Sequence, residues 1–236
     1  TISNVPDRPD TGSTVDQSDE VGLRLRQARE QAGLSLRELA RRLELSASAL
    51  SQIETGKSRP SVKTLYAIVS ELGISLDELF ENPGAGSAEP PAEALGGDGN
   101  GTALAAAGPP MVQRAGERSS LELDSGVTWD RLTAAHDPDV DFLYTTYEVG
   151  GASSSNAKLV RHRGREYGIV LDGELEVTVG FETYKLEAGD SISFDSQEPH
   201  LLANRSDAPA TAIWFVIGRR QSDPRQPSFG SGGEGE

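Results

Sequence analysis

The chain has 236 residues, no cysteine, and 22 basic against 37 acidic side chains, which give a net charge of −15. This length allows one large domain or two small ones, and the absence of cysteine excludes disulfide frameworks and thiolate-bound zinc or iron–sulfur centres. No apolar run approaches the ~20 residues that a membrane-spanning helix needs, and residues 1–20 lack a basic stretch followed by an apolar one. We therefore expect a cytoplasmic protein without a membrane partner.

The charge is distributed unevenly along the chain. Residues 21–80 carry nine basic and seven acidic side chains, whereas the segments before and after them are net negative. Phosphate backbones attract positive charge, so a nucleic-acid contact is expected within residues 21–80 if there is one at all.

Three stretches contain too little apolar surface to offset the entropy cost of ordering them. Residues 1–18 are predicted to form a disordered arm, residues 82–110 a flexible linker rich in Gly, Ala and Pro, and residues 221–236 a disordered tail. Between them lie residues 19–81 and 111–220, whose hydrophobic patterns have different periods. The chain is therefore predicted to be multidomain.

Residues 19–81 show helical spacing of apolar side chains, interrupted by start and stop signals. Ser35, Ser46, Ser61 and Ser75 each precede an apolar face, as helix N-caps do, and glycine follows several of these faces. The pattern predicts an all-α bundle of five short helices, the last of which begins at Ser75.

The second and third predicted helices have the lengths and separation of a helix-turn-helix. In that motif residues 35–43 would cross the phosphate backbone, and residues 46–55 would enter the major groove. Three segments carry a more specific resemblance: 33–40 (GLSLRELA), 48–57 (SALSQIETGK) and 60–61 (PS). They resemble the Cro/phage-repressor type of DNA-binding domain, the XRE family. The resemblance covers residues 21–80 and implies sequence-specific binding to double-stranded DNA.

The expected DNA contacts divide into phosphate-binding and base-facing residues. Helix N-termini and cationic side chains suit phosphates, and Lys63 is a further candidate for such a contact. Gln52 could read adenine, but the other base-facing side chains are short, so specificity would also depend on DNA shape or on Arg8. The predicted DNA-binding residues are Ser35, Arg37, Arg41, Ser46, Ala47, Ser48, Ala49, Ser51, Gln52, Lys57 and Arg59. The resemblance also implies a partly buried ion pair between Arg29 and Glu54.

Residues 111–218 change to the alternating pattern of β-strands. Strand-like runs occur at 142–149, 174–179, 191–194 and 212–217, separated by turns that contain Gly and Asp. Short strands at regular spacing predict an all-β sandwich or barrel.

Two segments of this region resemble the two motifs of a cupin, a double-stranded β-helix barrel. Residues 160–173 (VRHRGREYGIVLDG) resemble the first motif, and residues 189–204, which contain His200 and Asn204, resemble the second. Cupin metals are usually held by three His and one Glu. Here the first His position is Val160, and two positions of the second motif also depart from the family pattern (Asp195 and Gln197 in place of Pro and Gly).

The remaining candidate metal ligands are His162, Glu166 and His200. Two His and one carboxylate suffice to bind a divalent ion such as Fe, Zn, Mn or Ni. The alternative is that these residues bond to one another or to an organic ligand without a metal. A barrel of this size can enclose one small ligand, so His162, Glu166, His200 and Tyr147 are the predicted ligand-binding residues. Further aromatic candidates for its walls are Trp129, Tyr144, Tyr167, Phe194 and Trp214.

The combination resembles one-component bacterial transcription regulators with a C-terminal cupin sensor. We expect a homodimeric repressor without catalytic residues, whose two recognition helices lie about 34 Å apart on a pseudo-palindromic operator. A small-molecule effector in the cupin would bias a DNA-competent state, which requires docking between the domains or dimerisation because a flexible linker transmits force poorly. One alternative is a mononuclear metal-dependent cupin enzyme, epoxidase- or dioxygenase-like, with a vestigial helix-turn-helix. Another is a structural DNA-binding protein with an inactive barrel.

Overall fold

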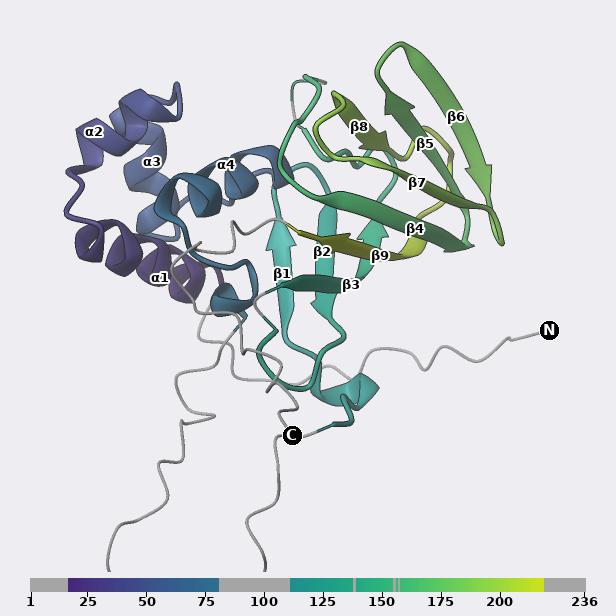
Figure 1. The fold of residues 1–236 in the computed structure, drawn as a ribbon, viewed down its shortest axis with the longest axis horizontal. Coiled ribbons are helices and arrows are strands. Elements are labelled where there is room, and N and C mark those ends of the chain that lie inside the picture. Colours follow the sequence, from purple (N-terminus) through teal and green to yellow (C-terminus); the bar gives the residue numbers. More distant parts are fainter. Residues whose placement is uncertain (1–16, 81–110, 138, 155, 157, 219–236) are drawn as a thin grey trace, which may run out of the picture.

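The computed structural model describes residues 17–80, 111–137, 139–154, 156 and 158–218. The N-terminal part of the described chain forms an α-helical domain, and the C-terminal part forms a β-domain (Figure 1). The predicted linker and tail lie outside the described residues, as does the predicted arm except for Gln17 and Ser18, which begin the first helix. Within the described residues, no helix combines the length and the apolar character needed to cross a membrane.

The helical domain contains α1 (Gln17–Gln31), α2 (Leu36–Arg42), α3 (Ala47–Glu54) and α4 (Val62–Leu72). Serine caps α2, α3 and α4: the hydroxyls of Ser35, Ser46 and Ser61 accept hydrogen bonds from the backbone N–H groups three residues later. These bonds satisfy N–H groups that have no partner within the helix. The apolar faces of the four helices meet in one core, in which the side chains of Leu25, Leu39, Leu50, Leu65 and Ile68 are almost completely buried.

The prediction of a fifth α-helix was wrong, because the segment after Ser75 forms only one turn of 3-10 helix, Asp77–Leu79. The start signal is present: Ser75 Oγ accepts a hydrogen bond from Glu78 N, and Glu78 Oε1 accepts one from Ser75 N. A cap starts a turn but does not extend it, since a helix gains stability only as further turns are added.

Nine strands form the β-domain within the residues that the structure describes, and every pairing described between them is antiparallel. The strands are β1 (Ser120–Leu123), β2 (Val127–Arg131), β3 (Val140–Tyr147), β4 (Arg165–Asp172), β5 (Glu174–Val179), β6 (Glu182–Glu187), β7 (Ser191–Asp195), β8 (His200–Ala203) and β9 (Ala210–Ile217). A short 3-10 turn, Ala115–Glu117, precedes them. One sheet has the order β1-β2-β3-β9-β4-β7, and the other has the order β6-β5-β8.

The two sheets pack around an apolar core that follows from strand alternation. Every second residue of β3 and β9 is buried, and the large side chains Leu143, Val170 and Val177 are almost fully enclosed. The predicted closed barrel is not formed by the described pairings. The described residues between positions 151 and 164 lie outside the strands. They contact β8 through the isolated bridges Ala152–Ala203 and Val160–His200 and through Ser153, whose N–H donates to Leu202 O, so no continuous ladder is described between the sheets.

The helical domain is docked on the β-domain, with α4 beside the strands (Figure 1). Around the start of α4, Asp124 N donates to Pro60 O (2.9 Å), and Lys63 N donates to Ser153 O (3.1 Å). A second group of contacts surrounds the buried carboxylate of Asp77.

The buried carboxylate of Asp77 in the helical domain is 3.2 Å from Arg131 Nη1 and 2.9 Å from His136 Nδ1 of the β-domain, and it accepts a hydrogen bond from Asp137 N. The two domains are therefore docked. Such docking is one of the two conditions under which effector binding could influence DNA binding despite a flexible linker.

Candidate DNA interface and metal centre

Helices α2 and α3 form the two arms of a helix-turn-helix. The turn between them, residues 43–46, includes Glu44 in the left-handed region (φ 56°), which allows the chain to change direction sharply between the two helices. Leu50 and Ile53 anchor α3 in the core. Its opposite face is directed to solvent.

The predicted base-facing residues lie on this outer face of α3. Ser48 and Gln52 are exposed, and Ala47, Ala49 and Ser51 are partly exposed. Ser35 and Ser46 lie at the N-termini of α2 and α3, where they cap the helices and are exposed. The positive ends of both helix dipoles are thus accessible to phosphates.

The predicted phosphate-binding cations differ in their surroundings. Arg37 and Lys57 are exposed and form no ion pair with any residue that the structure describes. Arg41 Nη2 lies 2.8 Å from Glu38 Oε1, and Arg41 and Arg42 together lower the pKa of Glu38 to about 2. Arg41 would therefore have to leave Glu38 to contact DNA.

The structure places Arg59 at the boundary between the domains. Its Nη2 lies 2.8 Å from Glu122 Oε2 on β1. Both side chains are substantially exposed, so this pair is weak and can exchange with a phosphate contact.

A buried ion pair joins α1 to α3. Arg29 Nε and Nη2 donate to the two carboxylate oxygens of Glu54 at 2.6 and 2.9 Å, and Arg29 Nη1 donates to Leu34 O at 2.8 Å. Glu54 and Ile53 are the last buried residues of α3. The bidentate pair therefore fixes the C-terminal end of the recognition helix against α1.

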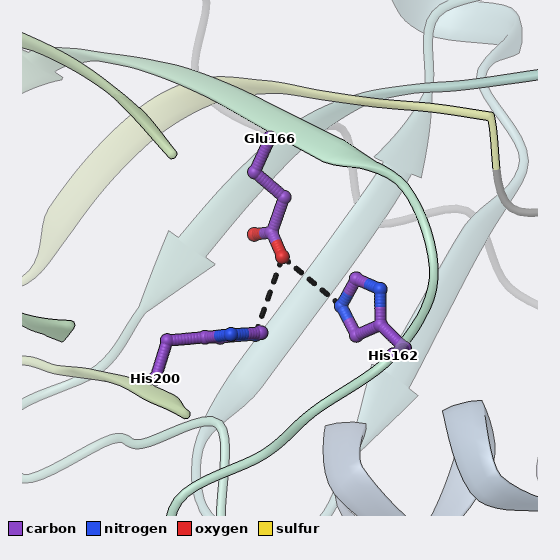
Figure 2. A group of neighbouring side chains, drawn as sticks. All are labelled: His162, Glu166 and His200. Carbon is purple, nitrogen blue, oxygen red and sulfur yellow. Dashed lines mark ion pairs between the residues drawn. The ribbon is translucent and has the colours of Figure 1, made fainter. Parts of the chain in front are cut away.

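His162, Glu166 and His200 converge on one point of the β-domain (Figure 2). Glu166 comes from β4, His200 from the start of β8, and His162 from the segment before β4. Glu166 Oε1 is 3.0 Å from His162 Nε2 and 3.2 Å from His200 Nε2. The potential ligand atoms of the three residues lie within 4.8 Å of one another.

The hydrogen bonds around the two imidazoles determine which nitrogen faces Glu166. His162 Nδ1 lies 3.0 Å from Arg163 O, and His200 Nδ1 lies 2.9 Å from Glu198 O. A carbonyl oxygen only accepts, so both Nδ1 atoms carry the proton and both Nε2 atoms are directed inward.

Glu166 Oε1 is buried and has no hydrogen-bond partner, despite its short distances to both rings. The Nε2 atoms of both imidazoles therefore face this one carboxylate oxygen. A bound cation would satisfy all three atoms.

The protonation states of the centre also suit a cation. Burial alone would raise the pKa of Glu166, but His162, His200 and the indole N–H of Trp214 outweigh it and hold the pKa below its usual range. Burial lowers the pKa of His200 more than Glu166 raises it. An ionised carboxylate and a neutral imidazole are the forms that bind metals.

Trp214 on β9 holds the carboxylate oxygen of Glu166 that does not face the histidines. Its Nε1–H donates to Glu166 Oε2 at 2.7 Å. Hydrogen bonds of this kind hold a metal ligand in position. The residues present therefore fit a divalent metal ion, which would be held by His162, Glu166 and His200.

The cavity beside these three residues has a volume of about 20 Å³. Tyr147, predicted to bind ligand, lines it, as do Trp129 and Trp214. Burial raises the pKa of Tyr147, so its hydroxyl stays protonated. Tyr144, Tyr167 and Phe194 are not among the residues that line this cavity, and Tyr167 is exposed on the outer face of β4.

Sequence reasoning missed Tyr66, which lies on α4 of the helical domain yet lines the cavity of the β-domain. Its ring stacks on the imidazole of His162, with centroids 4.4 Å apart and planes inclined by 27°. A second contact joins it to Trp129 at 5.4 Å. The one signal in the sequence is that Tyr66 is the aromatic residue of α4. Its contact with His162 follows only from the docking of the two domains.

His200→Ala is expected to abolish stoichiometric metal binding, because it removes one of three ligands. Trp214→Phe is expected to weaken metal affinity about 10–100-fold through loss of the hydrogen bond to Glu166. The measurement is elemental analysis and competitive titration of the purified chain after loading with Fe(II) or Zn(II). His136→Ala is the matched control, because His136 lies at the domain boundary beside Asp77. Equal metal content in all four proteins would contradict the assignment.

Comparisons with known proteins agree with both parts of the structure. Residues 25–79 match a helix-turn-helix family model, and residues 143–216 match a cupin domain model. The HTH-type transcriptional regulator PuuR of Escherichia coli is 29% identical over 185 residues, covering 78% of this chain and 88% of the relative. The HTH-type transcriptional regulator SutR of the same organism is 25% identical, covering 76% and 84%. A crystal structure of an HTH_3 family transcriptional regulator from Vibrio cholerae aligns with a TM-score of 0.59 at 22% identity, covering 86% of this chain and 97% of that one.

Proposed function

We propose that this chain is a DNA-binding transcriptional regulator whose cupin domain responds to a small molecule. The proposal starts from the two domain matches, a helix-turn-helix domain followed by a cupin domain. The observation that carries the proposal is the outer face of α3, which presents Ser48 and Gln52 to solvent while the Arg29–Glu54 pair fixes the helix behind it. Its similarity to HTH-type transcriptional regulators over more than three quarters of its length supports the same function.

In the proposed complex, α3 lies in the major groove and Gln52 contacts a base edge, with adenine as the preferred base. Arg37, Lys57 and the capped N-termini of α2 and α3 contact phosphates, which set register without reading sequence. Ala47, Ala49 and Ser51 are close to the bases but have short side chains. Part of the specificity is therefore assigned to DNA shape.

The regulator is proposed to act as a homodimeric repressor. Two copies of α3 about 34 Å apart, or a multiple of that distance, would match a pseudo-palindromic operator. The docked arrangement of the domains supports coupling, because a change at the β-domain can alter how α4, and with it α3, is held.

A second candidate function is a mononuclear metal-dependent oxygenase, and the His162–Glu166–His200 centre favours it. The neighbouring volume of about 20 Å³ weighs against it, since it has room for a water or an ion but none for an organic substrate. Oxygen consumption by the iron-loaded chain with candidate substrates would favour the enzyme over the regulator.

Replacing Gln52 by alanine is expected to reduce discrimination between the operator and random duplex by about 1–3 kcal/mol, because a base-specific contact is lost. Lys57→Ala is expected to weaken binding to all duplexes alike and to reduce the salt-dependence slope by about 1. Affinities for the chain's own promoter region and for random DNA, measured over a series of salt concentrations, test both. Lys185→Ala is the control, because Lys185 is an exposed cation on β6 of the β-domain. Absence of any promoter preference, or variants that match the control, would refute the proposed function.

A further inference from the structure

Two cavities of very different size meet at His162. The inner one, of about 20 Å³, adjoins the His162–Glu166–His200 centre. The outer one is an open cleft of about 740 Å³ between α4 and residues 160–163. Tyr66, Val160 and His162 line both of them and form the wall between them.

The volumes of the two cavities suit ligands of different size. A cavity needs roughly 10–15 Å³ to hold one water, whereas pockets for organic ligands measure about 300–1,000 Å³. The inner cavity therefore suits a single ion or water. Of these two cavities, only the outer cleft has room for an organic effector.

The charges around the outer cleft indicate the chemical class of its ligand. Lys63 of α4 lies on one wall and Arg161 and Arg163 on the other, and no acidic side chain is among the residues that line it. Neither Lys63 nor Arg161 forms an ion pair with any part of the chain that the structure describes. These positive charges stand on a chain whose net charge is −15. Ser70 adds a hydroxyl, and Val69 and Ile74 add apolar surface.

We propose that this cleft between the domains, and not the interior of the β-domain, binds the organic effector, and that the effector is a small anion bearing carboxylate or phosphate groups. The regulatory role of this ligand rests on the proposed function. The binding site itself stands on the volume, the charges and the position of the cleft.

An anion in this cleft touches both domains at once. Lys63 belongs to the helical domain, whereas Arg161 and Arg163 belong to the β-domain, so both domains contribute positive charge to the cleft. A bound anion attracts cations of both domains and stabilises the docked arrangement. Tyr66, which stacks on His162 in the shared wall, connects this cleft to the candidate metal ligands.

Titration of the full-length chain with succinate, with inorganic phosphate and with succinamide tests the proposal, at an ionic strength held constant with NaCl. Calorimetry and the melting temperature are the two readouts. We expect succinate or phosphate to bind and to raise the melting temperature, and the two arms distinguish a carboxylate from a phosphate ligand. Neutral succinamide, which is similar in size to succinate, is expected not to bind.

Charge-removing variants locate the binding site. Lys63→Gln and Arg161→Gln are each expected to weaken binding of the anion about tenfold, the loss of one charge-assisted contact. Arg205→Gln, an exposed arginine on the loop after β8, is the control and is expected to leave it unchanged. Binding of neither anion, equal binding of succinamide, or undiminished binding by Lys63→Gln and Arg161→Gln would overturn the proposal.

The affinity of the same proteins for promoter DNA separates this inference from the proposed function. Operator preference without anion binding would overturn the cleft assignment and leave the regulator intact. Anion binding that depends on Lys63 and Arg161, in a chain without operator preference, would support the site and refute the regulator.

Discussion

Arg29→Ala is expected to destabilise the helical domain by about 3–5 kcal/mol, because it leaves the buried carboxylate of Glu54 without its partner. Arg29 and Glu54 are 7% and 6% exposed, so water cannot replace the lost contacts. The variant also loses the hydrogen bond to Leu34 O, which holds the chain between α1 and α2. Thermal and urea unfolding, followed by circular dichroism, measure the effect.

The matched control is Arg26→Ala, one turn earlier on the same helix. Arg26 pairs with Glu30 at 2.9 Å, but both side chains are about half exposed, so the expected loss is about 0.5 kcal/mol or less. The double replacement of Arg29 by Met and Glu54 by Leu should recover much of the stability, because no charge then remains buried. Equal melting shifts for Arg29→Ala and Arg26→Ala would show that the pair does not brace α3.

Gly168→Ala is expected to destabilise the β-domain by about 1–3 kcal/mol or more, because the added methyl group has no space. Gly168 on β4 lies directly opposite Trp214 on β9, and a Cβ atom at this position would lie 2.0 Å from Trp214 Cζ3. The indole must move, and its hydrogen bond to Glu166 is then lost. Metal affinity should therefore fall together with stability.

Gly116→Ala provides a control with the same chemical change. A Cβ atom at Gly116 would meet no described atom within 4 Å, so a neutral effect is expected. Unfolding measurements and metal titration on both variants check the prediction. If Gly168→Ala retained both wild-type stability and wild-type metal affinity, the close packing of Trp214 on β4 would be disproved.

The local structure of the helical domain was largely predictable from the sequence. Ser35, Ser46 and Ser61 were expected to cap helices, and each accepts the predicted hydrogen bond. Caps and apolar periodicity act within a few residues, so they can be read from neighbouring positions. The same signals failed at Ser75, where the cap is present but the helix does not extend beyond one 3-10 turn.

The candidate metal centre was predictable only in part. The motif resemblance selected His162, Glu166 and His200, and the structure brings their ligand atoms together. Trp214 was named only as a possible wall residue, although its N–H orients the carboxylate. Its contact with Glu166 joins residues 48 positions apart, and no local pattern encodes such a pairing.

The two domains and the exposed face of α3 could be predicted from residues 17–80 and 111–218, because periodicity and capping are local properties, and the resemblance to the cupin motifs supplied the three candidate ligands. How the domains meet depends on tertiary packing. It placed Tyr66 of α4 against His162, directed Arg59 to Glu122, and opened a cationic cleft between Lys63 and Arg161. These contacts join surfaces distant along the chain, and they form when complementary shapes and charges pack together.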